Sequence, residues 1–235
     1  MKNHYAVVLF GGKGERFGSS LPKQFVEIGG KPLMVYTLFN LSSSKDIDEI
    51  VVVAPLEYLQ KTADIIEKYH LKKISVVIPG GPSREQSALK GLDYLYKKGI
   101  SCSSLVMIHD GDRPNTSHKV IANNFSVALF MGACITAANC QDSVAYSMEG
   151  YLVDKYYNRN LTYLVQTPQT FRFDLIYKLM IKANNKRILH KFGDEGKILR
   201  YFHRQLKIVD GDPTNIKITT QFDAKLFLSI LKEKK

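Results

Sequence analysis

Short runs of apolar, β-branched residues alternate with longer amphipathic stretches over most of the chain, and this alternation constrains the fold more than any other feature. An apolar run without polar alternation is typical of a strand that is buried on both faces, as in a parallel sheet. The runs lie at residues 7–9, 50–54, 74–78, 105–108 and 133–138. With helices between them, they predict an α/β fold with a doubly wound, largely parallel sheet. Ligands of such sheets bind at the carboxyl ends of the strands.

Helical periodicity and capping residues mark the segments between and after these runs. Ser83 begins a capping box and an amphipathic helix, and Thr220 and Asp223 are expected to cap a last helix. The apolar face of the last helix is expected to consist of Phe222, Leu226 and Ile230. Further helices are expected at 32–41, 55–69, about 121–129, from about 174, and 195–202, and further strands at 206–209 and 216–219. No repeat or linker interrupts the sequence, so we expect residues 1–235 to form a single domain.

Residues 141–166 lack helical periodicity, and several tyrosines alternate there with polar residues. Glu149 and Gly150 favour a turn, so the sequence predicts a protruding β-hairpin arm at about residues 140–166. Exposed tyrosines are typical of docking surfaces. We therefore expect a homodimer in which the arm docks on a second copy of the chain.

The chain is basic, because 33 Lys and Arg against 22 Asp and Glu give a net charge of +11 and a pI near 9.4. A positive net charge of this size favours binding to negatively charged partners, such as nucleic acid, a membrane surface or small anionic substrates. The basic residues form no stripe interleaved with aromatic side chains, so we expect no nucleic-acid partner. No stretch approaches the roughly 18 apolar residues of a membrane span, so we expect no membrane partner.

The three cysteines, Cys102, Cys134 and Cys140, have neither metal-ligand nor redox spacing, and they cannot all pair within one chain. A reducing compartment explains this usage most simply. No signal-peptide pattern precedes the first apolar run. We therefore expect a cytoplasmic protein.

A glycine-rich, cationic loop follows the first apolar run. It contains Gly11, Gly12, Gly14 and Gly18 together with Lys13, Arg16 and Lys23. Glycine lets backbone N–H groups approach an anion closely, and the cations neutralise its charge, so a polyphosphate is the expected guest. The spacing excludes the dinucleotide fingerprint, which needs glycine at Phe17, and no Gly-Lys-Ser/Thr triplet completes a P-loop.

Two further segments place polar side chains where buried strands are expected to end. Arg84 and Ser87 face the same way in the first turn of a helix that follows Gly80-Gly81. They form either a second polar wall for the ligand or an ordinary turn. Asp110 follows the run at 105–108, where a magnesium ion that bridges phosphates would need an oxygen ligand.

The residues around Asp110 also have purely structural interpretations. Asp112 and Arg113 can pair with each other, and His109 can be a hydrogen-bonded core residue. Lys217 can be an outward-facing residue of the expected strand at 216–219. Taken alone, none of these residues identifies a reaction.

Six collinear motifs, which together span nearly the whole chain, resemble one family. They are Leu9-Phe10-Gly11-Gly12-x-Gly14-x-Arg16, Pro22-Lys23-Gln24, Gly80-Gly81-x-x-Arg84-x-x-Ser87, His109-Asp110-x-x-Arg113-Pro114, Gln166-Thr167-Pro168-Gln169 and Asn215-Ile216-Lys217-Ile218-Thr219. The chain is similar to the cytidylyltransferases typified by the methylerythritol-phosphate enzyme and by ribitol-5-phosphate cytidylyltransferase. This resemblance implies a Rossmann-like fold of the nucleotide-diphospho-sugar transferase type. It also implies Mg²⁺-dependent transfer of CMP from CTP to a phosphorylated polyol, which gives a CDP-polyol and pyrophosphate.

The resemblance assigns roles to individual residues. It implies that the catalytic residues are Arg16, Lys23 and Lys217. It implies that CTP is bound by Phe10, Gly11, Gly12, Gly14, Gly81, Arg84, Ser87, Asp110 and Gly111, and that Asp110 organises the metal. The implied acceptor-binding residues are Arg113, Asp142, Ser143, Arg159, Thr167 and Lys217. Those on the arm would reach the site of the neighbouring subunit.

Residues that differ between branches of the family indicate which acceptor is used. The residues similar to the ribitol-5-phosphate branch are Gly11-Gly12, Ala145, Asn158-Arg159 and the run Gln-Thr-Pro-Gln-Thr-Phe. Ribitol 5-phosphate is therefore the expected acceptor. The product would be CDP-ribitol, a precursor of a cell-wall or capsule polymer. Methylerythritol phosphate of isoprenoid biosynthesis and a phosphonate remain alternatives, because Gly193 stands where the family has threonine.

Two hypotheses outside cytidylyl transfer also remain open. A glycine and arginine loop after the first strand is shared with enzymes that use UTP, GTP or ATP and a sugar 1-phosphate. The basic surface would equally serve a non-enzymatic domain that binds a nucleotide or a nucleic acid. Phe10 and Asp112 both depart from the family pattern.

Overall fold

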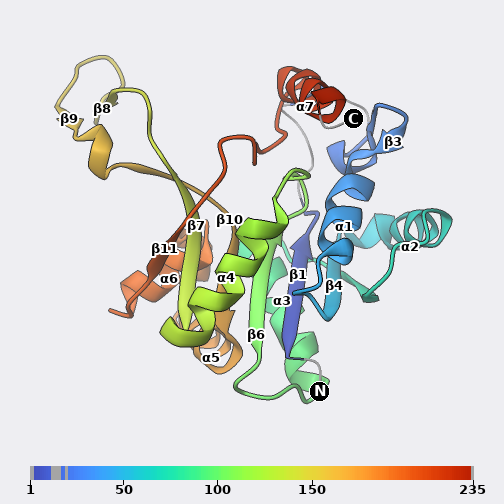
Figure 1. The fold of residues 1–235 in the computed structure, drawn as a ribbon. Helices are drawn as coiled ribbons and strands as arrows, with labels where there is room; N and C mark the ends of the chain where they lie inside the picture. Colours follow the sequence, from blue (N-terminus) through green and yellow to red (C-terminus); the bar gives the residue numbers. More distant parts are fainter. Residues whose placement is uncertain (1–2, 12–16, 19–20, 234–235) are drawn as a thin grey trace.

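The computed structural model describes residues 3–11, 17–18 and 21–233, and a mixed sheet forms its centre (Figure 1). The strand order in this sheet is β11-β7-β10-β6-β1-β4-β5. The strands are β1 (His4–Leu9), β4 (Glu49–Ala54), β5 (Ile74–Pro79), β6 (Leu105–Asp110), β7 (Ala133–Asn139), β10 (Tyr163–Arg172) and β11 (Lys207–Asp210). Neighbouring strands are parallel, except that β10 is antiparallel to both β6 and β7. The expected α/β fold with a largely parallel sheet is confirmed.

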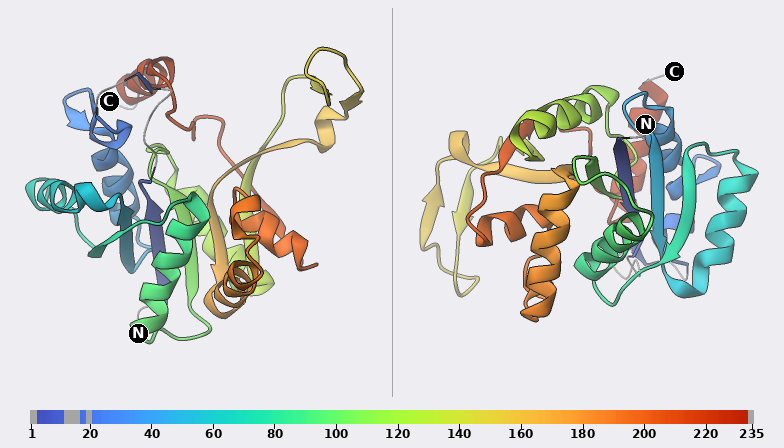
Figure 2. Two further views of the ribbon diagram at one scale, coloured as in Figure 1. Left: turned by 180° about the vertical axis from the view of Figure 1, so that it is seen from behind. Right: turned by 90° about the horizontal axis from the view of Figure 1, so that it is seen from below.

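Helices cover both faces of the sheet (Figure 2). They are α1 (Leu33–Ser43), α2 (Leu59–Lys68), α3 (Arg84–Lys97), α4 (His118–Met131), α5 (Phe173–Asn185), α6 (Glu195–Tyr201) and α7 (Gln221–Glu233). Successive residues of β1 point to opposite faces, so Val7 packs on the side of α3 and α5 while Val8 packs on the side of α1 and α4. The smaller elements are the strands β2 (Glu27–Ile28) and β3 (Lys31–Pro32) and the 3₁₀ turns Lys23–Phe25, Leu56–Tyr58, Arg159–Leu161 and Leu189–Lys191.

Helix α3 begins where its capping residue predicts and lies directly on β1. The Ser83 hydroxyl accepts a hydrogen bond from the Gln86 N–H at 3.2 Å. A Cβ added to Gly91 would lie only 2.4 Å from Cγ1 of Val7, so glycine permits this close approach. The packing brings Arg84, the first residue of α3, to the sheet edge at which β1 ends.

Strand β10 lies in the centre of the sheet, although its sequence was not recognised as a core strand. The sequence predicted that the arm extends to residue 166, whereas Tyr163–Arg172 form a strand between β6 and β7. The register shifts between Gln166 and Gln169, around the cis peptide bond that precedes Pro168. Buried polar side chains and a proline concealed the strand, because such residues are rare in central strands.

The strand expected at 216–219 is wrong, since these residues form no strand in the described part of the chain. The Ile218 N–H instead donates to the Asp112 carbonyl at 2.9 Å. The helix that follows starts as expected, because the Asp223 carboxylate accepts from the Thr220 N–H at 2.7 Å and the Asp223 N–H donates to the Thr220 hydroxyl.

The apolar face expected for the last helix is also wrong. Phe222 is 73% exposed and Leu226 is 42% exposed, whereas Phe227 is only 1% exposed. Phe227 packs with Leu33 and Ile218 in a small cluster beside the main core. The helix therefore turns a different side towards the protein, because it covers this satellite cluster and not the sheet.

The expected hairpin arm is confirmed and protrudes from the body of the molecule (Figure 1). It consists of β8 (Val144–Tyr146) and β9 (Lys155–Tyr157), which are antiparallel, with Ala145 opposite Tyr156. Gly150 lies in the connecting loop with a φ of 86°, a conformation that favours glycine. The exposed apolar side chains of the arm and its base include Met148, Tyr151, Leu152, Tyr156, Leu161 and Leu164.

Among the described residues, no helix is both long enough and apolar enough to cross a lipid bilayer.

Candidate active site

Asp110 is the last residue of β6 and lies opposite Leu9, the last residue of β1. Its carboxylate accepts a hydrogen bond from Nε of Arg84 at 2.9 Å and another from Nζ of Lys217 at 2.7 Å. Burial raises the pKa of Asp110, but these two cations outweigh burial and hold the pKa well below its usual range. Asp110 is therefore an anion at the ligand-binding edge of the sheet.

A second carboxylate, that of Asp112, lies beside the first. The Lys23 ammonium donates a hydrogen bond to it and a second one, at 3.1 Å, to the Ile218 carbonyl. Nζ of Lys217 is 3.9 Å from the other carboxylate oxygen of Asp112. Asp112 thus pairs with lysines and not, as one interpretation had it, with Arg113. Two lysines from distant parts of the sequence converge on two neighbouring acids.

The segment around Thr167 and Asn215 holds these groups in place. The Asp110 N–H donates to the Thr167 hydroxyl at 3.0 Å, and the Asn215 amide donates to the Thr167 carbonyl at 2.9 Å. The Arg113 guanidinium donates to the Asn215 carbonyl at 2.7 Å. These hydrogen bonds fix the backbone at Asn215. Because Lys217 follows only two residues later, they also help to place the Lys217 side chain in the pocket.

His109 is a hydrogen-bonded core residue and has no access to the pocket. Its ring is fully buried, and its Nε2 lies 3.2 Å from the Arg113 carbonyl and 3.3 Å from the Thr116 hydroxyl. Burial lowers the pKa of His109 to about 4, so the ring is neutral at pH 7.

These side chains line a pocket of about 280 Å³ at the carboxyl ends of β1 and β6. The lining residues are Leu9, Gly11, Lys23, Gly81, Pro82, Ser83, Arg84, Ser87, Asp110, Asp112 and Lys217. A Cβ added to Gly11 would lie 3.7 Å from the Ser87 hydroxyl, which itself accepts a hydrogen bond from the Gly81 N–H at 3.0 Å. Gly11 and the turn before α3 therefore line the same cavity.

The fold brings most of the residues that the motifs singled out to this pocket. Gly111, Arg113 and Thr167 lie beside Asp110 without lining the pocket. Three exceptions lie elsewhere or outside the described residues. Gly12, Gly14 and Arg16 lie outside the described residues. Asp142, Ser143 and Arg159, which are expected to bind the acceptor, lie on the arm, where all three are exposed, and not in the lining of this pocket.

The third exception is Phe10, whose ring lies in the core and not in the pocket. The side chain is 4% exposed and packs with Phe25 and Met34. A Cβ added to Gly111 would lie 2.3 Å from the Phe10 ring, so the ring occupies the space beside this glycine. The backbone of Phe10 is engaged as well, because its N–H donates to the Val53 carbonyl at 2.8 Å and its carbonyl accepts from the Gln24 amide at 3.0 Å.

The sequence did not indicate that Glu195 belongs to this network, and it gave Asp112 and Gln169 no individual role in the site. Both carboxylate oxygens of Glu195 accept hydrogen bonds from Nη1 of Arg84 at 2.9 and 3.0 Å. No local signal announces this contact, because Glu195 and Arg84 are 111 residues apart in the sequence. An acid at the start of a helix is ordinarily explained by the helix dipole.

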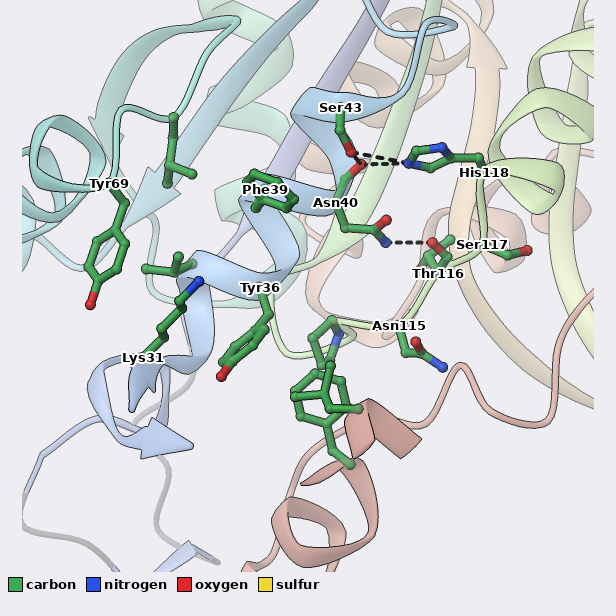
Figure 3. A pocket seen from close by; sticks show the side chains of 15 residues that line it. Lys31, Tyr36, Phe39, Asn40, Ser43, Tyr69, Asn115, Thr116, Ser117 and His118 are labelled. Atoms are coloured by element: carbon green, nitrogen blue, oxygen red, sulfur yellow. Dashed lines mark hydrogen bonds between the residues drawn. The ribbon is translucent and has the colours of Figure 1, made fainter. Parts of the chain in front are cut away.

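A larger cavity of about 510 Å³ lies between α1, α7 and the start of α4 (Figure 3). Several of its polar groups are already hydrogen-bonded within the protein, as Ser43 is with His118 and as the Asn40 amide is with the Thr116 carbonyl. None of the residues that carry the motifs' chemistry lines it. The smaller pocket around Asp110 is therefore the candidate active site.

Comparison with known proteins gives a consistent family. The family model described as 2-C-methyl-D-erythritol 4-phosphate cytidylyltransferase matches residues 4–233. The curated enzyme of that name from Thermosipho melanesiensis is 39% identical over 94% of each chain. The one from Clostridium tetani is 34% identical over 95% of this chain and 88% of its own.

Solved structures agree with the sequence comparisons. The crystal structure of 4-diphosphocytidyl-2C-methyl-D-erythritol synthase from Anaerococcus prevotii has a TM-score of 0.83 and 32% identity, and the alignment covers 98% of this chain and 96% of that chain. The 2-C-methyl-D-erythritol 4-phosphate cytidylyltransferase of Francisella tularensis has a TM-score of 0.81 and 25% identity, with 96% and 98% covered.

These findings favour the methylerythritol alternative over the expected preference for ribitol 5-phosphate, which they do not support. Part of that preference rested on glutamines that have structural partners within the chain. Gln169 accepts a hydrogen bond from the Gly196 N–H, and Gln166 accepts one from the Asn215 amide. Because hydrogen bonds within the protein explain these two glutamines, their presence does not indicate which acceptor is used. The matched span and the identity to curated relatives show that this chain is a nucleotidyltransferase that belongs to the 2-C-methyl-D-erythritol 4-phosphate cytidylyltransferase family.

Proposed function

We propose that this chain transfers the CMP group of CTP to 2-C-methyl-D-erythritol 4-phosphate and releases pyrophosphate. The observation that carries the proposal is the convergence of Lys23, Arg84 and Lys217 on one pocket at the carboxyl ends of β1 and β6. Relatives named for this reaction supply the identity of the two substrates.

In the reaction, an oxygen of the acceptor's phosphate attacks the α-phosphorus of CTP. A new P–O–P linkage forms, and the bond from the α-phosphorus to the bridging oxygen breaks, so that pyrophosphate leaves with the electron pair. Negative charge grows on the oxygens around the α-phosphorus. The ammonium groups of Lys23 and Lys217, which Asp112 and Asp110 already hold in the pocket, stabilise this charge. Arg16 is proposed to share this role from outside the described residues.

The nucleotide is proposed to bind along the two glycine segments. Gly11 leaves room for the triphosphate, a role also proposed for Gly12 and Gly14, which lie outside the described residues, while Gly81, Arg84 and Ser87 form the wall for the cytosine and its ribose. The Ser87 hydroxyl also holds the Gly81 backbone, so a contact with the nucleotide would extend an existing hydrogen-bond chain. Phe10 and Gly111 are proposed to support this site from beneath, where the Phe10 ring occupies the space beside Gly111.

The acceptor is proposed to bind beside Lys217, with Arg113 and Thr167 bracing the site and with arm residues supplied by a second subunit. Asp142, Ser143 and Arg159 are exposed on an arm that projects from the body (Figure 1). The arm's apolar side chains are also exposed, as expected of a surface that is covered on assembly. A homodimer in which each arm completes the partner's site accounts for both facts.

The residues present fit a magnesium ion. Mg²⁺ prefers oxygen ligands, and Asp112 Oδ1 is buried without a hydrogen-bond partner among the described residues. Asp110 and Asp112 would hold the ion, although the described residues include no cluster of three or more metal-binding side chains. When bound, Mg²⁺ neutralises charge on the triphosphate and on the departing pyrophosphate.

Pyrophosphate release tests the proposal. With Mg²⁺ and 2-C-methyl-D-erythritol 4-phosphate, we expect release from CTP and little from UTP, GTP or ATP. The Lys23→Ala variant should remain folded and lose about 100-fold or more in kcat, whereas Lys119→Ala, which removes an exposed lysine from α4, should not. A preference for another nucleotide, or full activity of Lys23→Ala, would overturn the proposal.

Mixing two inactive variants tests the shared site. Lys23→Ala disables a subunit's own pocket, and Arg159→Ala disables its arm. In mixed dimers, one of the two sites combines an intact pocket with the partner's intact arm, so about one quarter of wild-type activity should return on random pairing. If mixing restores nothing although the variants exchange subunits, the arm does not serve the partner's site.

A further inference from the structure

Arg84 lies between two carboxylates, only one of which belongs to the pocket. Its Nε donates to Asp110 at 2.9 Å, while its Nη1 donates to both oxygens of Glu195 at 2.9 and 3.0 Å. The remaining nitrogen, Nη2, is buried and has no hydrogen-bond partner among the described residues. Burial lowers the pKa of Arg84, but the two carboxylates outweigh burial and raise it, so the guanidinium stays charged.

Glu195 itself cannot touch a ligand, because the whole residue is 0% exposed. A buried carboxylate is costly unless it is paired, and the described partner of this one is Arg84. Both its oxygens are engaged with a single nitrogen of a planar group. Together with the hydrogen bond that Nε donates to Asp110, this contact at Nη1 restricts where the guanidinium plane lies, which either contact alone would not.

The position of Glu195 is in turn fixed from the centre of the sheet. Glu195 begins α6, and the N–H of the next residue, Gly196, donates to the side-chain oxygen of Gln169 at 2.9 Å. Gln169 belongs to β10 and pairs with Ile108 of β6, two residues before Asp110. A Cβ on Gly196 would lie 3.0 Å from Ile135, so glycine lets the helix start lie close against the sheet.

We propose that Glu195, anchored through Gln169, is a positioning residue that holds the Arg84 guanidinium in the pocket wall for the bound nucleotide. The inference rests on the nucleotide site proposed above. It gives a role to Gln169, whose side chain faces the start of α6 and not the pocket, and to an acid that lies too deep to react. Arg84, held at Nε and at Nη1, is then a preset positive charge in the pocket wall that faces CTP.

Calorimetric measurement of CTP binding in the presence of Mg²⁺ tests this inference without needing an acceptor. Glu195→Gln should weaken CTP binding by about 10- to 100-fold, the range typical of residues that orient a ligand-binding group. Asp194→Ala is the matched control, because Asp194 caps the same helix through the Lys197 N–H without contacting Arg84. It should destabilise the protein and leave CTP affinity within about twofold of the wild type.

A double-mutant cycle separates positioning from a general structural role. If Glu195 acts through Arg84, the combined variant Arg84→Met with Glu195→Gln should bind CTP as weakly as Arg84→Met alone. Should Glu195→Gln fail to fold, Gln169→Leu replaces it, since this change loosens the start of α6 without altering a charge. Gln169→Leu should weaken CTP binding in the wild-type background and not in the Arg84→Met background.

The outcomes distinguish this inference from the function on which it rests. A wild-type protein that does not bind CTP contradicts the proposed function. If the wild-type protein binds CTP and Glu195→Gln or Gln169→Leu binds it equally tightly, only the positioning role is overturned. The same holds if the loss of CTP affinity in either variant adds to the loss caused by Arg84→Met.

Discussion

The Lys23 ammonium donates a hydrogen bond to the Asp112 carboxylate, so a lysine proposed for catalysis is held by an acid of the same pocket. Burial, and then the charge of Asp110, raise the pKa of Asp112. A bound triphosphate has to compete with this carboxylate for Lys23. The pair therefore keeps the lysine in place before the nucleotide arrives, and it opposes nucleotide binding to some extent.

We expect Asp112→Asn to tighten the binding of CTP measured without divalent metal. Removing one negative charge a few ångströms from the triphosphate is worth about 1.4 kcal/mol, or about tenfold in Kd. The same variant should need more Mg²⁺ for half-maximal activity, because a neutral amide binds Mg²⁺ less strongly than the carboxylate proposed as its ligand. Isothermal titration calorimetry and a Mg²⁺ titration of the rate provide the two measurements.

Asp64→Asn is the control for net charge, because it removes an exposed acid from α2, away from the pocket. It should change neither CTP affinity nor the Mg²⁺ requirement. Weaker CTP binding by metal-free Asp112→Asn would show that Asp112 favours the nucleotide and does not compete with it.

Phe10 and Gly111 are expected to be coupled in stability. A Cβ at position 111 would lie 2.3 Å from the Phe10 ring, so Gly111→Ala forces the ring or the backbone to move. Overpacking of this kind costs about 1–3 kcal/mol, measured as the free energy of unfolding in urea. Adding Phe10→Leu should recover part of this loss, because the smaller side chain frees the space.

Gly11→Ala is the matched control for that prediction, since its Cβ would meet Ser87 at an ordinary contact distance of 3.7 Å. It should leave the free energy of unfolding almost unchanged. Equal stability of Gly111→Ala and the wild type would mean that the ring does not occupy this space in solution.

The cysteines should differ sharply in reactivity. Cys102 is exposed, whereas Cys134 and Cys140 are buried. Burial raises the pKa of Cys134 to about 12, so its thiol stays protonated at pH 8 and would ionise only near pH 12. At pH 8, a disulfide reagent should modify Cys102 rapidly, and the other two cysteines only in denaturant. Rapid modification of native Cys102→Ser would contradict this placement.

The sequence was informative where the signal is local. The five apolar runs predicted β1, β4, β5, β6 and β7, and the end of one run predicted that Asp110 lies at the ligand edge. Ser83 and Thr220 marked helix starts correctly, because capping depends on residues only three positions apart.

The contacts that complete the site could not be read in the same way, since they join residues far apart in the chain. Asp112 and Lys23 are separated by 89 residues, and no local pattern records their pairing. Strand β10 escaped recognition because Gln166 and Gln169 are buried with their polar groups bonded inside the protein. Burial of polar residues is a property of the assembled fold.

The ratio of kcat/KM for 2-C-methyl-D-erythritol 4-phosphate to that for ribitol 5-phosphate tests the central claim most directly. With saturating CTP and Mg²⁺, and pyrophosphate release as the readout, we predict a ratio of about 100 or more in favour of 2-C-methyl-D-erythritol 4-phosphate. Aminoethylphosphonate should be a poor acceptor as well. A ratio of one or less would contradict the account and return ribitol 5-phosphate as the acceptor.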